Sequence, residues 1–188
     1  MTVFAMCGSF CTLNDAFAEL EKMKLAEDEI LPVMSEKVYF TDTRFGLARV
    51  HVKRLEDICG KAVIHTVCDA EPIGPKMKPD VMVICPCTGN TLAKLANGIT
   101  DSCVTMAAKS HLRNGKPLVI CLATNDALGA NLVNIGKLMA RKNIYFVPMM
   151  QDDPIKKPTS LVADFTKLCD TVTEAGQGRQ MMPVFLEK

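Results

Sequence analysis

The sequence predicts an α/β fold: a doubly wound parallel sheet of about six strands, in three αβα layers, of the Rossmann-like or flavodoxin-like kind. Short apolar runs alternate with segments of helical periodicity along the chain, and no Gly-x-Gly-x-x-Gly follows the first run. At 188 residues the chain suits one such domain over residues 1–188. A mononucleotide is therefore a better match for the fold than NAD.

The strands and helices follow from apolar runs and from apolar residues at helical spacing. The predicted strands are residues 2–7, 30–34, 62–67, 81–85, 118–123 and 144–148. The predicted helices are residues 13–23, 48–59, 92–96, 104–112, 128–139 and 161–172. We expect Pro86 to end the fourth strand and Gly60 to end the second helix. Residues 176–188 are expected to form an extended tail or a short edge strand.

Composition excludes several classes of protein. Hydrophobic residues make up 48% of the chain, charged residues 23%, and the net charge is +1, which gives no field for nucleic acid or an anionic membrane. The first residues lack a basic segment, and no apolar run reaches the length of a membrane span. We therefore expect a cytoplasmic protein that binds neither nucleic acid nor membrane.

The nine cysteines are interpreted as buried, reduced thiols rather than as a metal site. Most of them lie in apolar runs, where a thiol acts as a small core residue. Cys85 and Cys87 alternate along one strand, so their side chains should point to opposite faces of the sheet. No metal is expected.

The stretch around residues 86–91 carries the strongest functional signal. A buried strand ends there in small polar residues, and a helix follows, with Thr88 or Asn90 able to cap it. In a parallel sheet such a junction lies at the carboxyl edge, where free backbone N–H groups bind ligands. The alternative is an ordinary strand-to-helix connection with the same residues as simple caps.

Two earlier junctions are weaker candidates. Gly8, Ser9 and Thr12 follow the first strand and precede a helix, which favours a phosphate, although a plain turn with Thr12 as its cap explains them too. Arg44 precedes the helix 48–59, where its guanidinium suits a carboxylate or phosphate; the alternative is a solvated side chain. The polar, proline-bounded segment 149–158 is interpreted as a solvated linker in preference to a substrate loop.

The order Pro86-Cys87-Thr88-Gly89-Asn90-Thr91 resembles the Pro-Ala-Ser-Ala-Asn-Thr signature of the homo-oligomeric flavin-containing cysteine decarboxylase family, which includes flavin prenyltransferases. The resemblance implies a Rossmann-like FMN-binding protein in trimer-based homo-oligomers. It implies that Gly8, Ser9 and Ser35 hold the FMN phosphate. It also places the flavin beside Pro86, Cys87, Thr88, Asn90, Thr91 and Asn125.

The chain also departs from the decarboxylases. They carry an active-site histidine before the signature strand, where this chain has Glu71-Pro72-Ile73-Gly74-Pro75, so decarboxylation is disfavoured; His65 is interpreted as a packing residue. The blocks 42–46, 124–129 and 151–158 resemble one branch of the family. That branch works with a partner of the NAD(P)-binding type to oxidise a dihydropyridine dicarboxylate in the mother cell of a sporulating bacterium.

This resemblance implies a small dicarboxylate substrate, and it implies NADP held by the NAD(P)-binding partner. Arg44, Lys156 and Lys157 are the candidates for binding the substrate carboxylates, because buried carboxylates need positive partners. Glu71 is the one candidate base. Three functions stay open: one component of a flavin-dependent dehydrogenase, a non-catalytic scaffold whose flavin site is empty or holds phosphate, and a decarboxylase or prenyltransferase of the wider family.

Overall fold

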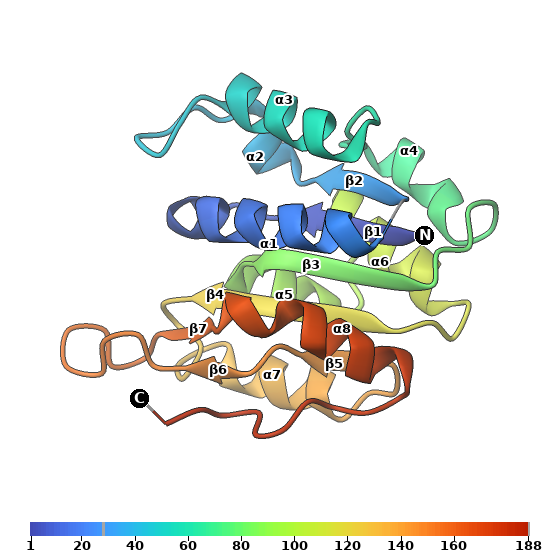
Figure 1. Cartoon of the computed structure of the whole chain (residues 1–188). Helices are drawn as coiled ribbons and strands as arrows, with labels where there is room; N and C mark the ends of the chain where they lie inside the picture. The colour runs from blue at the N-terminus through green and yellow to red at the C-terminus, as the bar shows by residue number, and fades with distance from the viewer. Residues whose placement is uncertain (28, 188) are drawn as a thin grey trace.

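A computed structural model describes residues 1–27 and 29–187 (Figure 1). Over these residues the chain forms a mainly parallel sheet of seven strands, which confirms the predicted fold class. The sheet order is β2 (Ile30–Met34), β1 (Thr2–Met6), β3 (Val81–Cys87), β4 (Leu118–Thr124), β7 (Leu161–Ala163) and β6 (Met149–Met150). Strand β5 (Ile144–Phe146) pairs in parallel with the first half of β4, whereas β7 pairs antiparallel with its end.

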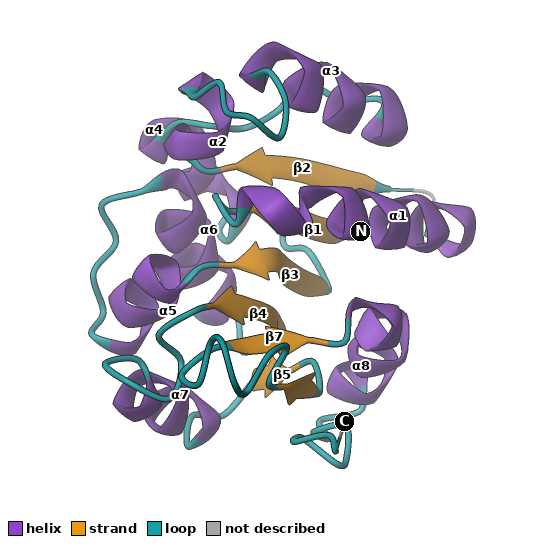
Figure 2. Ribbon diagram, turned by 90° about the vertical axis from the view of Figure 1, so that its left-hand side faces the viewer, coloured by secondary structure: helices purple, strands orange, loops and turns teal. Residues whose placement is uncertain are grey.

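Helices cover both faces of the sheet, as Figure 2 shows. One face packs against α1 (Leu13–Ala26), α3 (Ala48–Cys59), η3 (Phe165–Lys167) and α8 (Leu168–Gly176). The other packs against α4 (Val67–Ala70), η2 (Glu71–Ile73), α5 (Gly89–Ala96), α6 (Cys103–Leu112) and α7 (Leu132–Met139). The short elements η1 (Phe10–Thr12) and α2 (Glu36–Phe40) follow β1 and β2.

Continuous apolar runs form β1 and β3 because both faces of these strands are covered. Every residue of both strands is buried, and alternate side chains enter the two cores. Cys85 belongs to the core on the α1 side and Cys87 to the core on the α5 side. The predicted divergence of these two cysteines is confirmed.

Three sequence predictions about the sheet were wrong. Residues 62–67 do not form a strand: only Ile64 bridges to Val33, because Thr66 caps α4 immediately afterwards. Strand β3 continues beyond Pro86, since the β3–β4 register shifts between Ile84 and Cys87. Residues 161–163, predicted as the start of a helix, form β7, and with β6 they make an antiparallel pair. In the tail, Phe185 bridges to Met149.

The parallel strands bring the candidate junctions to one edge. In Figure 1 the arrowheads of β1, β2, β3 and β4 point to the left, where the loop between β6 and β7 also lies. Both β2 and β3 pair with β1, and β4 pairs with β3, so the strand ends are neighbours. Within the described residues, no helix has the length and apolar character needed to cross a membrane.

Gly74 provides a test of the packing on the α6 face. It follows η2, and an added Cβ would lie 1.9 Å from the carbonyl oxygen of Ser110 on α6. Gly74→Ala should therefore destabilise the protein by about 1–3 kcal/mol, because backbone must move to make room. Chemical denaturation monitored by circular dichroism measures this difference.

Gly136→Ala is the matched control. Gly136 lies within α7, and no atom lies within 4 Å of an added Cβ there, so alanine should raise stability by about 0.5–1 kcal/mol. Equal effects of the two substitutions would contradict the packing of η2 against α6.

Candidate functional site

A cavity of 710 Å³ opens at the carboxyl edge of the sheet. It is formed by the β1–α1 junction, the turn before α3, the β3–α5 junction, the end of β4, and the β6–β7 loop with the start of β7. The lining consists of Gly8, Ser9, Phe10, Cys11, Thr12, Phe45, Thr88, Gly89, Asn90, Ala123, Thr124, Asn125, Asp126, Asp152, Lys157, Ser160 and Val162. Segments far apart in sequence therefore share one hollow.

The β1–α1 junction presents hydroxyl groups at the start of a 14-residue helix. Thr12 Oγ1 lies 3.0 Å from both the carbonyl oxygen and the Oγ of Ser9, and it donates to them. Since Ser9 Oγ accepts here, its own proton is available to a ligand. The helical segment that begins with η1 and continues as α1 adds positive potential at its N-terminal end. This junction is suited to an anion.

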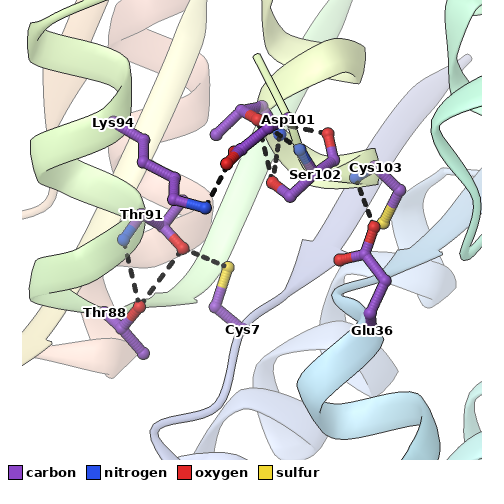
Figure 3. A network of polar contacts seen from close by, with 9 residues as sticks. Cys7, Glu36, Thr88, Thr91, Lys94, Asp101, Ser102 and Cys103 are labelled. Carbon is purple, nitrogen blue, oxygen red and sulfur yellow. Dashed lines mark hydrogen bonds and ion pairs between the residues drawn. The ribbon is translucent and has the colours of Figure 1, made fainter. Parts of the chain in front are cut away.

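At the β3–α5 junction the hydroxyls form a chain that ties α5 to Cys7, the residue after β1 (Figure 3). Thr88 Oγ1 accepts from the Thr91 backbone N–H at 3.3 Å and donates to Thr91 Oγ1 at 3.2 Å. Thr91 Oγ1 in turn donates to Cys7 Sγ at 3.3 Å. Burial raises the pKa of the Cys7 thiol to about 11, so Cys7 remains neutral. Thr88 therefore caps α5, as predicted, and Thr91 is a structural link.

Gly89 allows α5 to approach the end of β4 closely. An added Cβ would lie 2.6 Å from both Asn131 Nδ2 and Thr124 Oγ1, and 2.8 Å from Asp126 Oδ1. These side chains are bonded to one another: Thr124 Oγ1 donates to Asp126 Oδ1, and Asn131 Nδ2 donates to Asp126 Oδ2 at 2.9 Å. The network occupies the space that the alanine of the family signature would need, which explains the glycine.

Asp126 stays ionised in this network. The hydrogen bond from Thr124 lowers its pKa, and the bond from Asn131 lowers it further. A carboxylate held in this way positions Thr124 and the loop after β4. It is a weak base at neutral pH.

The β6–β7 loop forms the outer wall of the cavity. Lys157 Nζ lies 2.6 Å from Asp152 Oδ2, and this hydrogen bond lowers the pKa of Asp152 and raises that of Lys157. Thr159 Oγ1 donates to the Asn125 carbonyl at 2.7 Å, and Ser160 Oγ donates to the Thr124 carbonyl at 3.3 Å. The loop is thus attached to the end of β4 and contributes to the cavity, contrary to its interpretation as a solvated linker.

The structure brings together part of the predicted set. The predicted residues that line the cavity are Gly8, Ser9, Thr12, Thr88, Asn90, Asn125 and Lys157. Pro86 and Cys87 are buried in β3, and Thr91 is only 7% exposed, so these three lie behind the lining. Ser35 is also outside it; its Oγ is buried and makes no hydrogen bond within the described part of the chain.

Three further candidates lie outside the cavity wall. Glu71 is exposed on η2, which packs against α6, so within one chain it is not placed to act as a base at this cavity. Lys156 is exposed on the β6–β7 loop, next to Lys157. Arg44 lies against the ring of Phe45, with its guanidinium carbon 4.8 Å from the ring centroid.

Sequence reasoning missed several lining residues. Thr124 ends β4 and Asp126 lies two residues later, on either side of the predicted Asn125, and their position at the end of a buried strand was the available signal. Asp152 and Ser160 lie between β6 and β7, and they could have been predicted as lining residues only if this strand pair had been recognised. Phe10 and Phe45 carry no local pattern that distinguishes them from core residues. The three histidines of the chain, all within the described residues, lie outside the lining.

Comparison with known proteins shows what the chain is similar to. The family model described as Flavoprotein matches residues 13–175. The B subunit of dipicolinate synthase from Bacillus subtilis is 45% identical over 184 residues, which cover 98% of this chain and 92% of that protein. The crystal structure of the corresponding protein from Bacillus halodurans has a TM-score of 0.91 and 43% identity, covering 100% of this chain and 96% of the other. An FMN-dependent cysteine decarboxylase, SpaF, has the same fold, with a TM-score of 0.68 and 23% identity over 94% of this chain and 95% of that one.

The close approach at Gly89 can be tested directly. Gly89→Ala should lower stability by about 1–3 kcal/mol, because the new methyl group displaces hydrogen-bonded side chains. Gly129→Ala, in the loop between β4 and α7, is the control, since its Cβ would meet only the Asp126 carbonyl oxygen at an ordinary 3.5 Å. Urea denaturation of both variants measures these stabilities. An unchanged denaturation midpoint for Gly89→Ala would contradict the hydrogen-bonded network next to Gly89.

The lowered pKa of Asp126 predicts a pH dependence. Because the folded pKa is lower than the unfolded value of about 3.9, the carboxylate stabilises the fold fully above that value and loses this contribution as the pH falls through the folded pKa. The difference in unfolding free energy between the wild type and Asp126→Asn should therefore shrink from about pH 5 towards pH 3. A free-energy difference that is constant over this pH range would refute the lowered pKa of Asp126.

Proposed function

The chain belongs to the Flavoprotein family, and from this premise we propose that it is the FMN-binding component of a dipicolinate synthase. In this proposal it acts with the A subunit of that enzyme, which is of the NAD(P)-binding type, to oxidise dihydrodipicolinate to dipicolinate. The observation that carries the proposal is the convergence of Ser9, Thr88 and Asn125, from three separate strand ends, on one cavity. The identity with the B subunit of dipicolinate synthase over nearly the whole chain supports the reaction.

The β1–α1 junction fits the phosphate of FMN. Gly8 allows the backbone to approach closely, Ser9 keeps a proton to donate, and the N-terminus of α1 favours a dianion. Ser35 is kept as a proposed phosphate contact because its buried hydroxyl lacks a partner among the described residues. Buried hydroxyls normally have a partner, so a bound group is one way to satisfy it.

The rest of the cavity fits a flat ring. Its volume of 710 Å³ lies within the usual range for ligand pockets, roughly 300–1,000 Å³. Phe10 and Val162 provide apolar contact for the flavin ring, and the side chains of Asn90 and Asn125 provide amide groups for orientation. When bound, FMN supplies an acceptor for a hydride. Proteins of the same fold include ones described as FMN-dependent decarboxylases, which supports this choice of cofactor.

The charge of the cavity limits how this chain binds a dicarboxylate. The charged groups of the described lining are Asp126, Asp152 and Lys157, and Lys157 is paired with Asp152. To bind a dianionic substrate, Lys157 must therefore give up its ion pair with Asp152, and a further cation must be supplied. In this proposal Arg44 and Lys156, at the rim, or the A subunit of the enzyme provide that cation, and the A subunit holds NADP.

The cavity contains no strong base. Asp126 and Asp152 have lowered pKa values, and the histidines lie elsewhere. The role proposed for this chain is thus to bind and orient the rings, while the ring proton leaves to the A subunit or to water.

The absence of a strong base from the described lining also favours a second candidate, a scaffold for the A subunit without catalytic function. A cysteine decarboxylase or prenyltransferase is the third alternative, tested by product formation from a cysteinyl peptide.

The proposed setting follows from the relatives. A protein of the same fold is described as dodecameric, which supports a homo-oligomer, and the family resemblance favours one built from trimers. Dipicolinate synthase would act in the cytoplasm of the mother cell during sporulation.

Titration with FMN tests the cofactor assignment. The purified chain should bind FMN with a visible absorption band, and Ser9→Ala should weaken FMN binding roughly tenfold, since a hydrogen bond to a charged group is lost. The affinity for riboflavin, which lacks the phosphate, should be unchanged. Thr173→Ala removes an exposed hydroxyl on α8 and is the control. Equal losses for FMN and riboflavin would contradict the phosphate site.

Reconstitution with the A subunit separates the catalytic role from the scaffold. We expect the ultraviolet band of dipicolinate to grow faster when this chain and FMN are both added to the A subunit with NADP than when the chain is added without FMN. Full activity of the A subunit in the absence of this chain would end the proposal of a catalytic role.

A further inference from the structure

Phe45 is an exposed aromatic side chain at a cavity that needs to hold flat rings. It lines the cavity and is 43% exposed, although it lies in the connection between α2 and α3, far from the other lining segments in sequence. Phe10, the other aromatic side chain of the lining, packs against Gly8 at the β1–α1 junction. Phe45 is thus the more accessible candidate for stacking.

The turn that carries Phe45 is tightly built. The Gly46 N–H donates to the Thr43 carbonyl at 3.1 Å, and the Thr43 N–H donates to the Gly46 carbonyl at 3.0 Å. The Phe45 N–H also donates to Thr43 Oγ1 at 3.1 Å. Asp42 Oδ1 accepts from the Ala48 N–H at 2.8 Å and so attaches the turn to the start of α3. These bonds hold the backbone of Phe45 in place before any ligand arrives.

The turn also rests on α3. Gly46 has a φ of +139°, and an added Cβ would lie 2.6 Å from Nε2 of His51. The His51 side chain is 6% exposed and faces the ring of Phe17 on α1, with the ring centroids 6.1 Å apart. The space next to Gly46 is therefore filled by a buried side chain that packs on α1.

Arg44 places a cation on the ring of Phe45. Its guanidinium carbon lies 4.8 Å from the ring centroid, within the range of a cation–π contact. No carboxylate of the described residues forms an ion pair with Arg44, whereas Lys157, the lysine of the lining, is paired with Asp152. An exposed guanidinium beside an aromatic ring can turn towards a carboxylate at the edge of a ring that stacks there.

We propose that Phe45 and Arg44 form a recognition site for a flat heteroaromatic ring that carries carboxylates. Phe45 stacks on the ring and Arg44 pairs with a carboxylate. This inference rests on the proposed function and adds the residues that select the substrate. The charge favours a pyridine dicarboxylate over the flavin ring, because isoalloxazine carries no carboxylate for Arg44 to pair with.

Calorimetric titration of the FMN-loaded full chain with pyridine-2,6-dicarboxylate and with the uncharged pyridine-2,6-dicarboxamide tests this site. Phe45→Ala should weaken binding of both compounds roughly tenfold, and Phe45→Tyr should restore it. Arg44→Ala should weaken binding of the dicarboxylate alone, by about fivefold, and Arg44→Lys by less. FMN binding, followed by the visible band, should be unchanged in all four variants.

Two exposed neighbours are matched controls. Phe40 is 69% exposed and contacts Tyr39 and His65, and Arg49 lies on the outer surface of α3; both are outside the cavity lining. Phe40→Ala and Arg49→Ala should leave dicarboxylate affinity within twofold of the wild type. Losses in these variants equal to those of Phe45→Ala and Arg44→Ala would overturn the proposal.

The remaining outcomes are also distinct. If Phe45→Ala weakens FMN binding but not dicarboxylate binding, the ring that Phe45 contacts is the flavin, and the inference is wrong. If the wild type binds FMN but no dicarboxylate, the inference also fails while the cofactor assignment stands. If the wild type binds no FMN at all, the proposed function fails. Titration of the FMN-free chain with the dicarboxylate then tests the site formed by Phe45 and Arg44 on its own.

Discussion

The register of three parallel strands is the constraint on which the rest of the structure depends. Because β1 pairs with β3 and β3 with β4, the turns after these strands become neighbours at one edge. Short side-chain links then fix their separation: Thr91 reaches Cys7 across one gap, and Gly89 meets the Thr124 and Asp126 side chains across the other. A shift in either pairing would separate the polar groups that the cavity brings together.

The cavity is polarised along its length. The N-terminus of α1, with Ser9 and Thr12, presents donors and positive potential, whereas the β4 end and the β6–β7 loop carry the carboxylates of Asp126 and Asp152. A ligand with one anionic end and a neutral ring matches this arrangement better than a small dianion does. This difference is why we assign FMN to the cavity itself and the dicarboxylate to its rim, near Phe45.

Local pattern was enough to predict the junction residues but not the direction of each side chain. Ser9 and Thr88 were predicted because polar residues follow buried strands, Asn125 was predicted from the family resemblance, and each one lines the cavity. Thr91 belongs to the same motif as Thr88, yet its hydroxyl donates to Cys7 after β1, which spacing alone does not reveal. The three residues of β7 are too few to show a period, so the loop before them was interpreted as a linker. Phe45 reaches the cavity only through tertiary structure.

A crystal structure of the chain with FMN tests the central claim most directly, namely that the strand ends form one site for a phosphorylated mononucleotide. The account predicts the phosphate within hydrogen-bond distance of Ser9 at the N-terminus of α1, and the flavin ring between the β3–α5 junction and the end of β4. Density for FMN at another surface, such as the groove lined by Lys109, Arg113 and Arg141, would contradict it.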